Sequence, residues 1–186
     1  PAPEGAAAWQ ASSTERITLR CGVEAPAQYT PYAQTEDIDD ARWLRVNDAT
    51  PGSTLATWFT VDRSPVLAVT ADVEQLRSGA APVAGIDTSA LNGPAPEQHP
   101  APLADLAAAG DAGTCDSLLD AAPDSIAEGY TRVDAVSEQT VAWSAEGQDA
   151  IVLRCGVADP ENYGPGARLD QINGVPWFED VKLANG

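Results

Sequence analysis

Two stretches of this 186-residue chain are copies of each other at a spacing of 134 residues, and this duplication constrains the fold more than any other sequence feature. Residues 4–46 and 138–180 are identical at 16 of 43 positions without a gap, where chance would give only a handful. The shared positions include two pairs of tryptophans and a central Arg-Cys-Gly-Val: Trp9 with Trp143, residues 20–23 with 154–157, and Trp43 with Trp177. We infer that the chain contains two units of one duplicated domain.

The two copies differ outside the shared stretch. The first continues to residue 78 through a Thr-Pro-Gly-Ser turn, whereas the second has additional residues in front of the repeat. Between them the chain is rich in Ala, Pro and Gly without a periodic pattern, which is typical of a linker. The predicted organisation is a first repeat unit without its N-terminal part (1–78), a linker (79–112), and a second repeat unit without its C-terminal part (113–186).

Strands are predicted where apolar and polar residues alternate. In both copies Ile, Leu, Cys and Val fall on one face, over residues 17–23 and 151–157, so that Arg20 and Arg154 project from the other face. Further strand candidates and one hairpin follow from similar patterns: residues 130–136 and 139–144 as strands, and residues 56–62 with 65–71 as the hairpin.

Two short helices are expected. Asp72 is a plausible N-cap, with Gln75 at the capping-box position and Gly79 as the stop. A second helix is predicted from about Cys115 to Ala122, with Thr114 as its cap and Pro123 at its end. The sum is an α+β fold, with a mixed, mainly antiparallel sheet and a few short helices.

The three cysteines bear on the compartment in which the protein works. Cys115 on a short helix and Cys155 on the inward face of a strand are candidates for a disulfide between helix and sheet. Other arrangements stay open: the pair is reduced and buried, or Cys115 pairs with Cys21 instead. In the favoured arrangement Cys21 is either a buried thiol or has lost a partner upstream of Pro1. An oxidised pair would place the protein outside the cytoplasm.

Charge excludes one class of partner. With 28 acidic residues, 10 basic residues and a formal charge of −18, the chain has no electrostatic footprint for nucleic acid, and an anionic membrane surface would repel it. No apolar run approaches the roughly 20 residues that span a bilayer. The chain contains no Met, so we expect Pro1 to be a processed end and membrane association to occur only through a removed N-terminal anchor.

Recognisable catalytic, cofactor and metal motifs are missing from the sequence. It has no GxSxG elbow, phosphate-binding glycine loop, CxxC pair or EF-hand spacing, and its one histidine, His99, is far from any cysteine. Acidic clusters at residues 36–40 and 179–180 could support glycoside hydrolysis or hold calcium, but a solvated acidic face is expected in so acidic a chain. We therefore assign no catalytic residue, no metal ligand and no cofactor.

Repeated aromatic and arginine side chains are the best candidates for a binding surface. Most repeated tryptophans anchor a core, but Trp and Arg also cluster at interface hot spots and sugar platforms. The candidates recur at matching repeat positions: Arg20 and Arg154, Trp43 and Trp177, and Tyr29 and Tyr163.

Several of these motifs resemble the actinobacterial domain-of-unknown-function family 3515. The second copy carries CDSLLDAAPDS, YTRV, AIVLRCGVADP and INGVPWF, and the first carries ITLRCGVEAP, RWL and TWFTVDRSPVLAVTAD. The resemblance covers most of the chain except the linker. It implies an exported protein with an N-terminal signal or anchor, a helix-to-strand disulfide and a cell-envelope setting, and it implies no reaction. The first copy departs from the pattern, because residues 39–41 are Asp-Asp-Ala where residues 173–175 are Asn-Gly-Val, so we expect the turn before Trp43 to differ.

Together these observations predict a non-catalytic extracytoplasmic module. We expect it to bind a protein partner or to serve as an accessory subunit of a cell-envelope membrane complex, either membrane-anchored or secreted. The alternative is an envelope hydrolase or carbohydrate-binding enzyme that uses a carboxylate pair near the repeated tryptophans.

Overall fold

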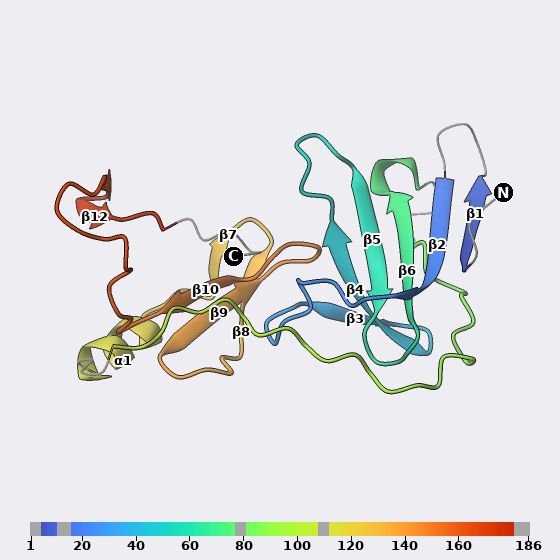
Figure 1. Cartoon of the computed structure of the whole chain (residues 1–186), viewed down its shortest axis with the longest axis horizontal. Helices are drawn as coiled ribbons and strands as arrows, with labels where there is room; N and C mark the ends of the chain where they lie inside the picture. Colours follow the sequence, from blue (N-terminus) through green and yellow to red (C-terminus); the bar gives the residue numbers. More distant parts are fainter. Residues whose placement is uncertain (1–4, 11–15, 77–80, 108–111, 181–186) are drawn as a thin grey trace.

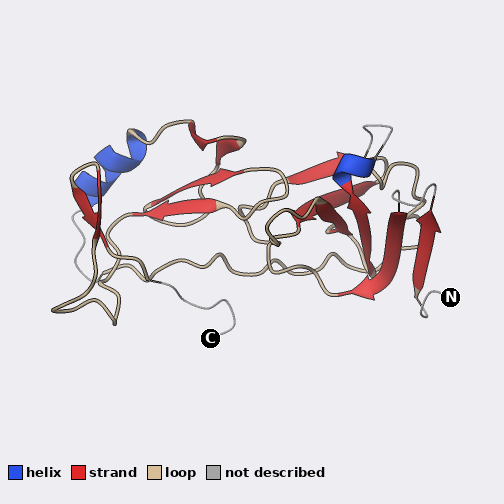
Figure 2. Cartoon of the chain, turned by 90° about the horizontal axis from the view of Figure 1, so that it is seen from above, coloured by secondary structure: helices blue, strands red, loops and turns tan. Residues whose placement is uncertain are grey.

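The computed structural model describes residues 5–10, 16–76, 81–107 and 112–180. The two repeat units lie at opposite ends of an elongated molecule and are joined by a long connection that runs along one side (Figures 1 and 2). All strand pairs are antiparallel within the described residues, apart from one isolated parallel bridge between the units. The described chain is thus mainly β, with little helix.

The first unit forms one six-stranded sheet. Its strands are β1 (Ala6–Gln10), β2 (Arg16–Val23), β3 (Thr35–Ile38), β4 (Ala41–Asn47), β5 (Leu55–Thr60) and β6 (Val66–Asp72). They are ordered β1-β2-β6-β5-β4-β3, so the β5–β6 hairpin lies at the centre of the sheet. This hairpin confirms the one predicted from residues 56–62 and 65–71. Its apolar side chains, with Trp43 and Trp58, form the main buried core.

The second unit is divided into two sheets. Helix α1 (Ala112–Asp120) precedes β7 (Ser125–Ala127), β8 (Tyr130–Val133), β9 (Thr140–Ser144) and β10 (Ile151–Arg154), which form a sheet of order β10-β9-β8-β7. Strands β11 (Asp170–Ile172) and β12 (Val175–Trp177) pair only with each other, and Figure 1 shows them apart from β10.

The structural repeat follows the sequence repeat residue by residue. Trp9 pairs with Ile17 between β1 and β2, and Trp143 pairs with Ile151 between β9 and β10. Likewise β3–β4 has the same register as β11–β12, because Ile38 pairs with Ala41 and Ile172 pairs with Val175. The 134-residue offset therefore relates β1–β2 to β9–β10 and β3–β4 to β11–β12.

The helices are fewer and differently placed than the sequence pattern predicts. Only a 3₁₀ turn, η1 (Val73–Gln75), follows β6, where a helix reaching Gly79 was expected; Gly79 itself lies outside the described residues. The Asp72 side chain accepts a hydrogen bond from the Glu74 backbone N–H, and the Val73 N–H donates to the Thr54 carbonyl, which continues the strand pairing by one residue. The backbone is extended again at Leu76, so the turn does not continue as a helix. Helix α1 begins at Ala112, so Thr114 lies inside it and is not its cap.

Much of the predicted linker packs against the first unit. Val83 is 1% exposed and joins the core, while the partly buried Ala81, Ile86 and Leu91 pack around it. Ser64 and Gly93 form a two-way backbone bridge, which fixes the end of this segment against the β5–β6 turn. The described residues 81–93 are therefore part of the first unit.

Candidate functional site

The central hairpin of the first unit has no counterpart in the described second unit. Strands β6 and β5 join β2 to β4 and make one sheet of the first unit. In the second unit β10 and β12 occupy the equivalent positions, but no described strand lies between them. The outer edge of β10 consequently presents unpaired backbone groups, which form a template for another strand.

The apolar side chains of β11 and β12 are exposed, and no described strand other than these two pairs with them. Ile172, Val175 and Trp177 are 56%, 51% and 54% exposed, whereas the equivalent Trp43 is 2% exposed. A shallow pocket of about 210 Å³ lies beside them and is lined by Asp159, Pro160, Tyr163, Leu169, Pro176 and Phe178. We call the region between β10 and β12, bounded by Ile151–Arg154 and Val175–Trp177, the open slot.

The first unit has an open edge on its opposite side. Strand β1 is the last strand of its sheet, whereas its equivalent β9 pairs with β8. Trp9 on β1 is 55% exposed, while Trp143 on β9 is 4% exposed and donates a hydrogen bond from Nε1 to the Pro123 carbonyl at 2.8 Å. The segment that covers β9, from α1 to β8, has no described counterpart in the first unit.

The absence of a described counterpart to the α1-to-β8 segment in the first unit also explains why the cysteines of the two units differ. Cys115 on α1 and Cys155 directly after β10 form a disulfide, with Cα atoms 5.6 Å apart. Cys21, the repeat equivalent of Cys155, is a free and exposed thiol. The glycine after each cysteine has a positive φ, 78° at Gly22 and 74° at Gly156, and at Gly22 it coincides with a bulge in the β2–β6 register. The glycine of the Arg-Cys-Gly-Val motif therefore takes the left-handed conformation in both units, and in the first unit it forms a bulge.

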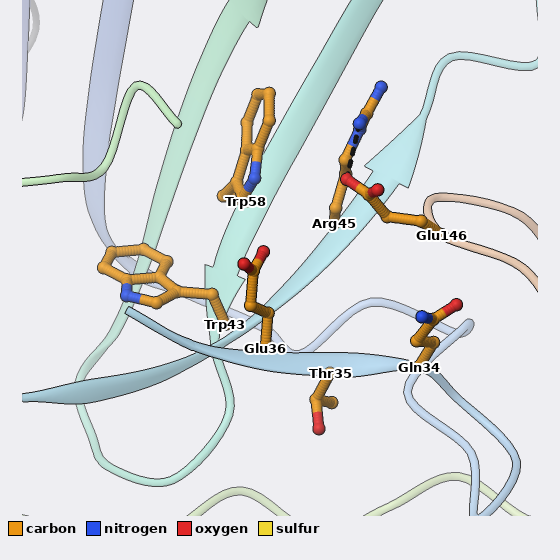
Figure 3. A pocket seen from close by; sticks show the side chains of 7 residues that line it. All are labelled: Gln34, Thr35, Glu36, Trp43, Arg45, Trp58 and Glu146. Carbon is orange, nitrogen blue, oxygen red and sulfur yellow. Dashed lines mark hydrogen bonds and ion pairs between the residues drawn. The ribbon is translucent and has the colours of Figure 1, made fainter. Parts of the chain in front are cut away.

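A groove of about 260 Å³ lies where the two units meet, and Figure 3 shows the side chains that line it. They come from β3, β4, β5 and the turn after β9: Gln34, Thr35, Glu36, Trp43, Arg45, Trp58 and Glu146. Arg45 donates from Nη1 to Glu146 Oε1 at 2.6 Å, and its guanidinium lies 5.4 Å from the Trp58 ring centroid. The groove thus combines an ion pair between the units with a cation–π contact.

Backbone contacts hold the same junction. The Asn47 N–H donates to the Gly147 carbonyl at 2.9 Å, and Val46 forms a parallel bridge with Gly147. Gly147 is buried with a φ of 72°, and a Cβ there would come within 2.5 Å of the Asn47 side chain. A glycine is therefore required for this approach of the two units.

The six residues predicted as a binding surface lie in different places. Trp43 is buried at the base of the groove, and Tyr29 donates its hydroxyl hydrogen to the Val61 carbonyl at 3.1 Å. Trp177 and Tyr163 are exposed in the second unit, where the Tyr163 ring packs against Phe178 at 5.2 Å. Arg20 is exposed on β2, while Arg154 donates from Nη1 to the Ala104 carbonyl at 2.7 Å.

Two residues of the acidic cluster at 36–40 bind residues 81–93, the part of the predicted linker that packs against the first unit. Asp39 accepts a hydrogen bond from the Gly85 N–H at 2.7 Å, and Asp40 accepts one from the Thr88 hydroxyl at 3.0 Å. Arg63 lies between them and binds Thr88, Asp40 and Asp62. Burial acts to raise the pKa of Asp62, but hydrogen bonds from Arg63 and the neighbouring backbone outweigh it and keep this pKa below its ordinary value.

His99 and Asp180, which the sequence also offered as site candidates, take part in hydrogen bonds within the protein. His99 is exposed; its backbone N–H donates to the Tyr29 carbonyl, and its Nε2 lies 3.3 Å from the Ala25 carbonyl. Asp180 accepts a hydrogen bond from the Asn162 amide at 3.0 Å. No group of three or more His, Cys, Asp or Glu side chains suited to a metal occurs within the described ranges.

The groove and the open strand edges are not predicted by any local sequence pattern. Arg45 and Glu146 are 101 residues apart, so no local pattern predicts their contact. The open slot could have been found by asking which segment each repeat lacks and which strands that segment would join.

Comparison with known proteins identifies the family. The family described as "Protein of unknown function (DUF3515)" matches this chain twice, over residues 1–93 and 83–185. The chain therefore belongs to this family and carries its domain in duplicate. No curated protein and no solved structure matches it. Among the described residues, neither helix is long and apolar enough to cross a membrane.

Proposed function

We propose that this chain is a non-catalytic protein-binding module that works outside the cytoplasm as an accessory subunit of a cell-envelope membrane complex. The outer edge of β10, with which no described strand pairs, is the observation that carries the proposal, because an unpaired strand edge is suited to strand addition by another protein. Trp177 on β12, which is exposed in the same unit, has the size and character of an interface anchor.

The disulfide supports the proposed compartment. Bonds such as Cys115–Cys155 persist in oxidising environments and are rare in the cytosol. Cys21 provides the test, because it is the one free and exposed thiol. A membrane-impermeant maleimide should label Cys21 in intact cells of the source organism. Labelling only after lysis would place the protein inside and contradict the proposal.

Photocrosslinking tests the binding function at the edge itself. A photoreactive amino acid at Ile151, which is 40% exposed on β10, should give one adduct of defined mass in intact cells. The matched control is Leu118, which is apolar, 50% exposed and located on α1 rather than on a strand. We expect the adduct at Ile151 alone and expect mass spectrometry to identify an envelope protein in it. Equal adducts at both positions, or none at either, would contradict the proposal.

The groove favours a second candidate, an envelope hydrolase or carbohydrate-binding enzyme. Glu36 and Glu146 line one cavity with Trp43 and Trp58, as a carboxylate-pair enzyme would require. Glu146 already binds Arg45, however, so the two carboxylates are not both free. The test is release of reducing ends from isolated cell-wall material. The hydrolase predicts release that Glu36→Gln abolishes, and the binding module predicts no release by the unaltered chain.

A further inference from the structure

We propose that the groove where the two units meet binds an arginine side chain of a partner protein, with the carboxylate of Glu36 receiving its guanidinium. This inference rests on the proposed protein-binding function and adds a second point of contact to the one at the β10 edge. It names the chemistry that the partner must present in the groove.

Two adjoining cavities make up this groove. The cavity of about 260 Å³ described above shares Glu36, Arg45, Trp58 and Glu146 with a second cavity of about 360 Å³. The rest of the second lining is apolar and consists of Val73, Leu76, Ala81 and Pro82. The groove therefore places carboxylates next to an apolar surface. An arginine side chain has the same two parts, because its charged head is carried on an alkyl stem.

Glu36 is the one charged residue of the groove lining that lacks a partner. It pairs across the strands with Trp43, so the two side chains project from the same face of the sheet. Arg45 and Glu146 bind each other, whereas Glu36 makes no hydrogen bond or ion pair within the described residues. In Figure 3 no dashed line reaches its carboxylate. The lining thus carries one unbalanced negative charge, which attracts a cation.

The second unit contains an arginine at the equivalent carboxylate. Asp170 is the repeat equivalent of Glu36 and pairs across the strands with Trp177. Two residues earlier, Arg168 places its Nη2 atom 3.6 Å from Asp170 Oδ1. The equivalent of Arg168 in the first unit is Gln34, which lines the groove but carries no charge. The first unit therefore has the acid and the tryptophan of this arrangement without the arginine.

The aromatic wall of the groove favours a guanidinium over an ammonium group. The Arg45 guanidinium lies 5.4 Å from the Trp58 ring centroid, so this wall already accepts one planar cation. A guanidinium stacks on aromatic rings and binds a carboxylate through two parallel hydrogen bonds, whereas an ammonium is a strongly hydrated point charge. Glu36 beside Trp43 and Trp58 offers both kinds of contact.

The charges of the groove favour a side chain over free arginine. Arg45 is the only basic residue of the lining, and Glu146 already binds it. The lining therefore has no free cation for the α-carboxylate of an amino acid. A chain with a charge of −18 also attracts basic proteins and repels a second copy of itself. The occupant is thus an arginine of a different protein.

N-acetyl-arginine amide, which has no free α-groups, is the probe for the site. Added to the full chain, it should shift the indole N–H signals of Trp43 and Trp58 in NMR spectra and saturate at about millimolar concentration, as expected for one side chain. N-acetyl-citrulline amide has nearly the same shape without the charge and should bind about tenfold more weakly. Equal affinities of the two compounds would overturn the inference.

Two substitutions test the role of Glu36. Glu36→Gln removes the charge of an exposed side chain and should weaken binding of the arginine probe about fivefold or more. Gln34→Arg introduces the arginine of the second unit, which should compete with the probe. The matched controls Glu97→Gln and Gln10→Arg change the net charge equally at exposed positions outside the groove lining and should leave the affinity unchanged. Equal weakening by a variant and its control would contradict the proposal.

Photocrosslinking shows whether the arginine belongs to the partner. With the photoreactive amino acid at Ile151, Glu36→Gln should lower the yield of the adduct in intact cells, and Glu97→Gln should not. An unchanged yield would mean that the partner presents no arginine to the groove and would overturn the inference. Tighter binding of free L-arginine than of the blocked amide, by about tenfold or more, would make an amino acid the ligand and would likewise overturn it.

The remaining outcomes separate this inference from the proposed function. An adduct at Ile151 without any effect of the arginine probe on either indole signal would keep the protein-binding function and overturn the arginine site. Release of reducing ends that Glu36→Gln abolishes would make a glycan the occupant of the groove and would overturn both. Absence of both the adduct and the indole shifts would also remove both proposals.

Discussion

Trp43 and Trp177 occupy equivalent positions in the two units, yet their surroundings are opposite. Both lie in the second strand of the same short hairpin with the same register, but Trp43 is 2% exposed and Trp177 is 54% exposed. The difference comes from β5–β6, which lies beside Trp43 and has no described counterpart near Trp177. Two local sequences that share only the Ile and the Trp thus form hairpins of the same register, while contact with another segment decides whether that hairpin is part of a core.

Trp9 and Trp143 show the opposite difference, because here the tryptophan of the first unit is exposed and that of the second unit is buried. Trp143 is 4% exposed because α1 to β8 covers β9, and Trp9 is 55% exposed on the uncovered β1. Within the described residues, the two units are therefore open on opposite sides, and each contains a segment that has no described counterpart in the other.

The largest effect is expected from truncating the two equivalent tryptophans. Trp43→Ala should cost about 3–5 kcal/mol in the free energy of unfolding of the first unit, because it leaves a cavity in the core. Trp177→Ala should change stability by less than about 0.5 kcal/mol, because the side chain is already exposed. Native-state hydrogen exchange of the Val69 amide in β6 and the Ala142 amide in β9 reports on each unit separately. Similar costs for the two substitutions would contradict the comparison.

Cysteine substitutions should also affect the stabilities of the two units differently. Replacing Cys115 and Cys155 together by Ser opens a loop of 40 residues and should destabilise the second unit by about 4 kcal/mol in the chain-entropy model. Cys21→Ser is the control, and we expect a change below about 0.5 kcal/mol because this thiol is exposed and unpaired. The same exchange measurements apply, and destabilisation of the first unit by the double substitution would show that the units are not independent.

Lowering the pH is expected to have a smaller effect on the stability of the first unit. The pKa of Asp62 is lower in the folded state than in the unfolded chain, so its contribution is present above the unfolded value and is lost as pH falls through the folded value. The first unit should therefore lose about 0.5–1 kcal/mol from this group below about pH 4, a modest amount because the carboxylate is partly exposed. Asp62→Asn should remove this part of the acid sensitivity in unfolding curves measured at pH 3 and pH 7. An unchanged acid dependence would mean that the ion pair with Arg63 does not contribute.

Much of this architecture follows from the sequence. The repeat offset gives the equivalence of the hairpins, alternation gives the strands around Arg-Cys-Gly-Val, and the apolar runs around residues 62–64 give the central hairpin. Cys115–Cys155 is the pairing that the sequence favours among several that it leaves open, and the structure contains this disulfide.

Other features depend on contacts that no local pattern contains. Strand β1 begins with three alanines, which have little strand preference, and becomes a strand by pairing with β2. Asp72 caps a single 3₁₀ turn because strand pairing continues through Val73. The groove depends on Arg45 meeting Glu146 across the units, and the exposure of Trp177 depends on a segment that is not beside it.

Amide hydrogen exchange at equivalent positions of β2 and β10 tests the central claim most directly. Thr18 and Arg20 face β6, whereas Val152 and Arg154 face the open slot. The account predicts strong protection of the Thr18 and Arg20 amides and rapid exchange of the Val152 and Arg154 amides in the isolated protein. Equal protection at the two pairs would mean that β10 already has a partner strand, and it would contradict the open edge on which the proposed function rests.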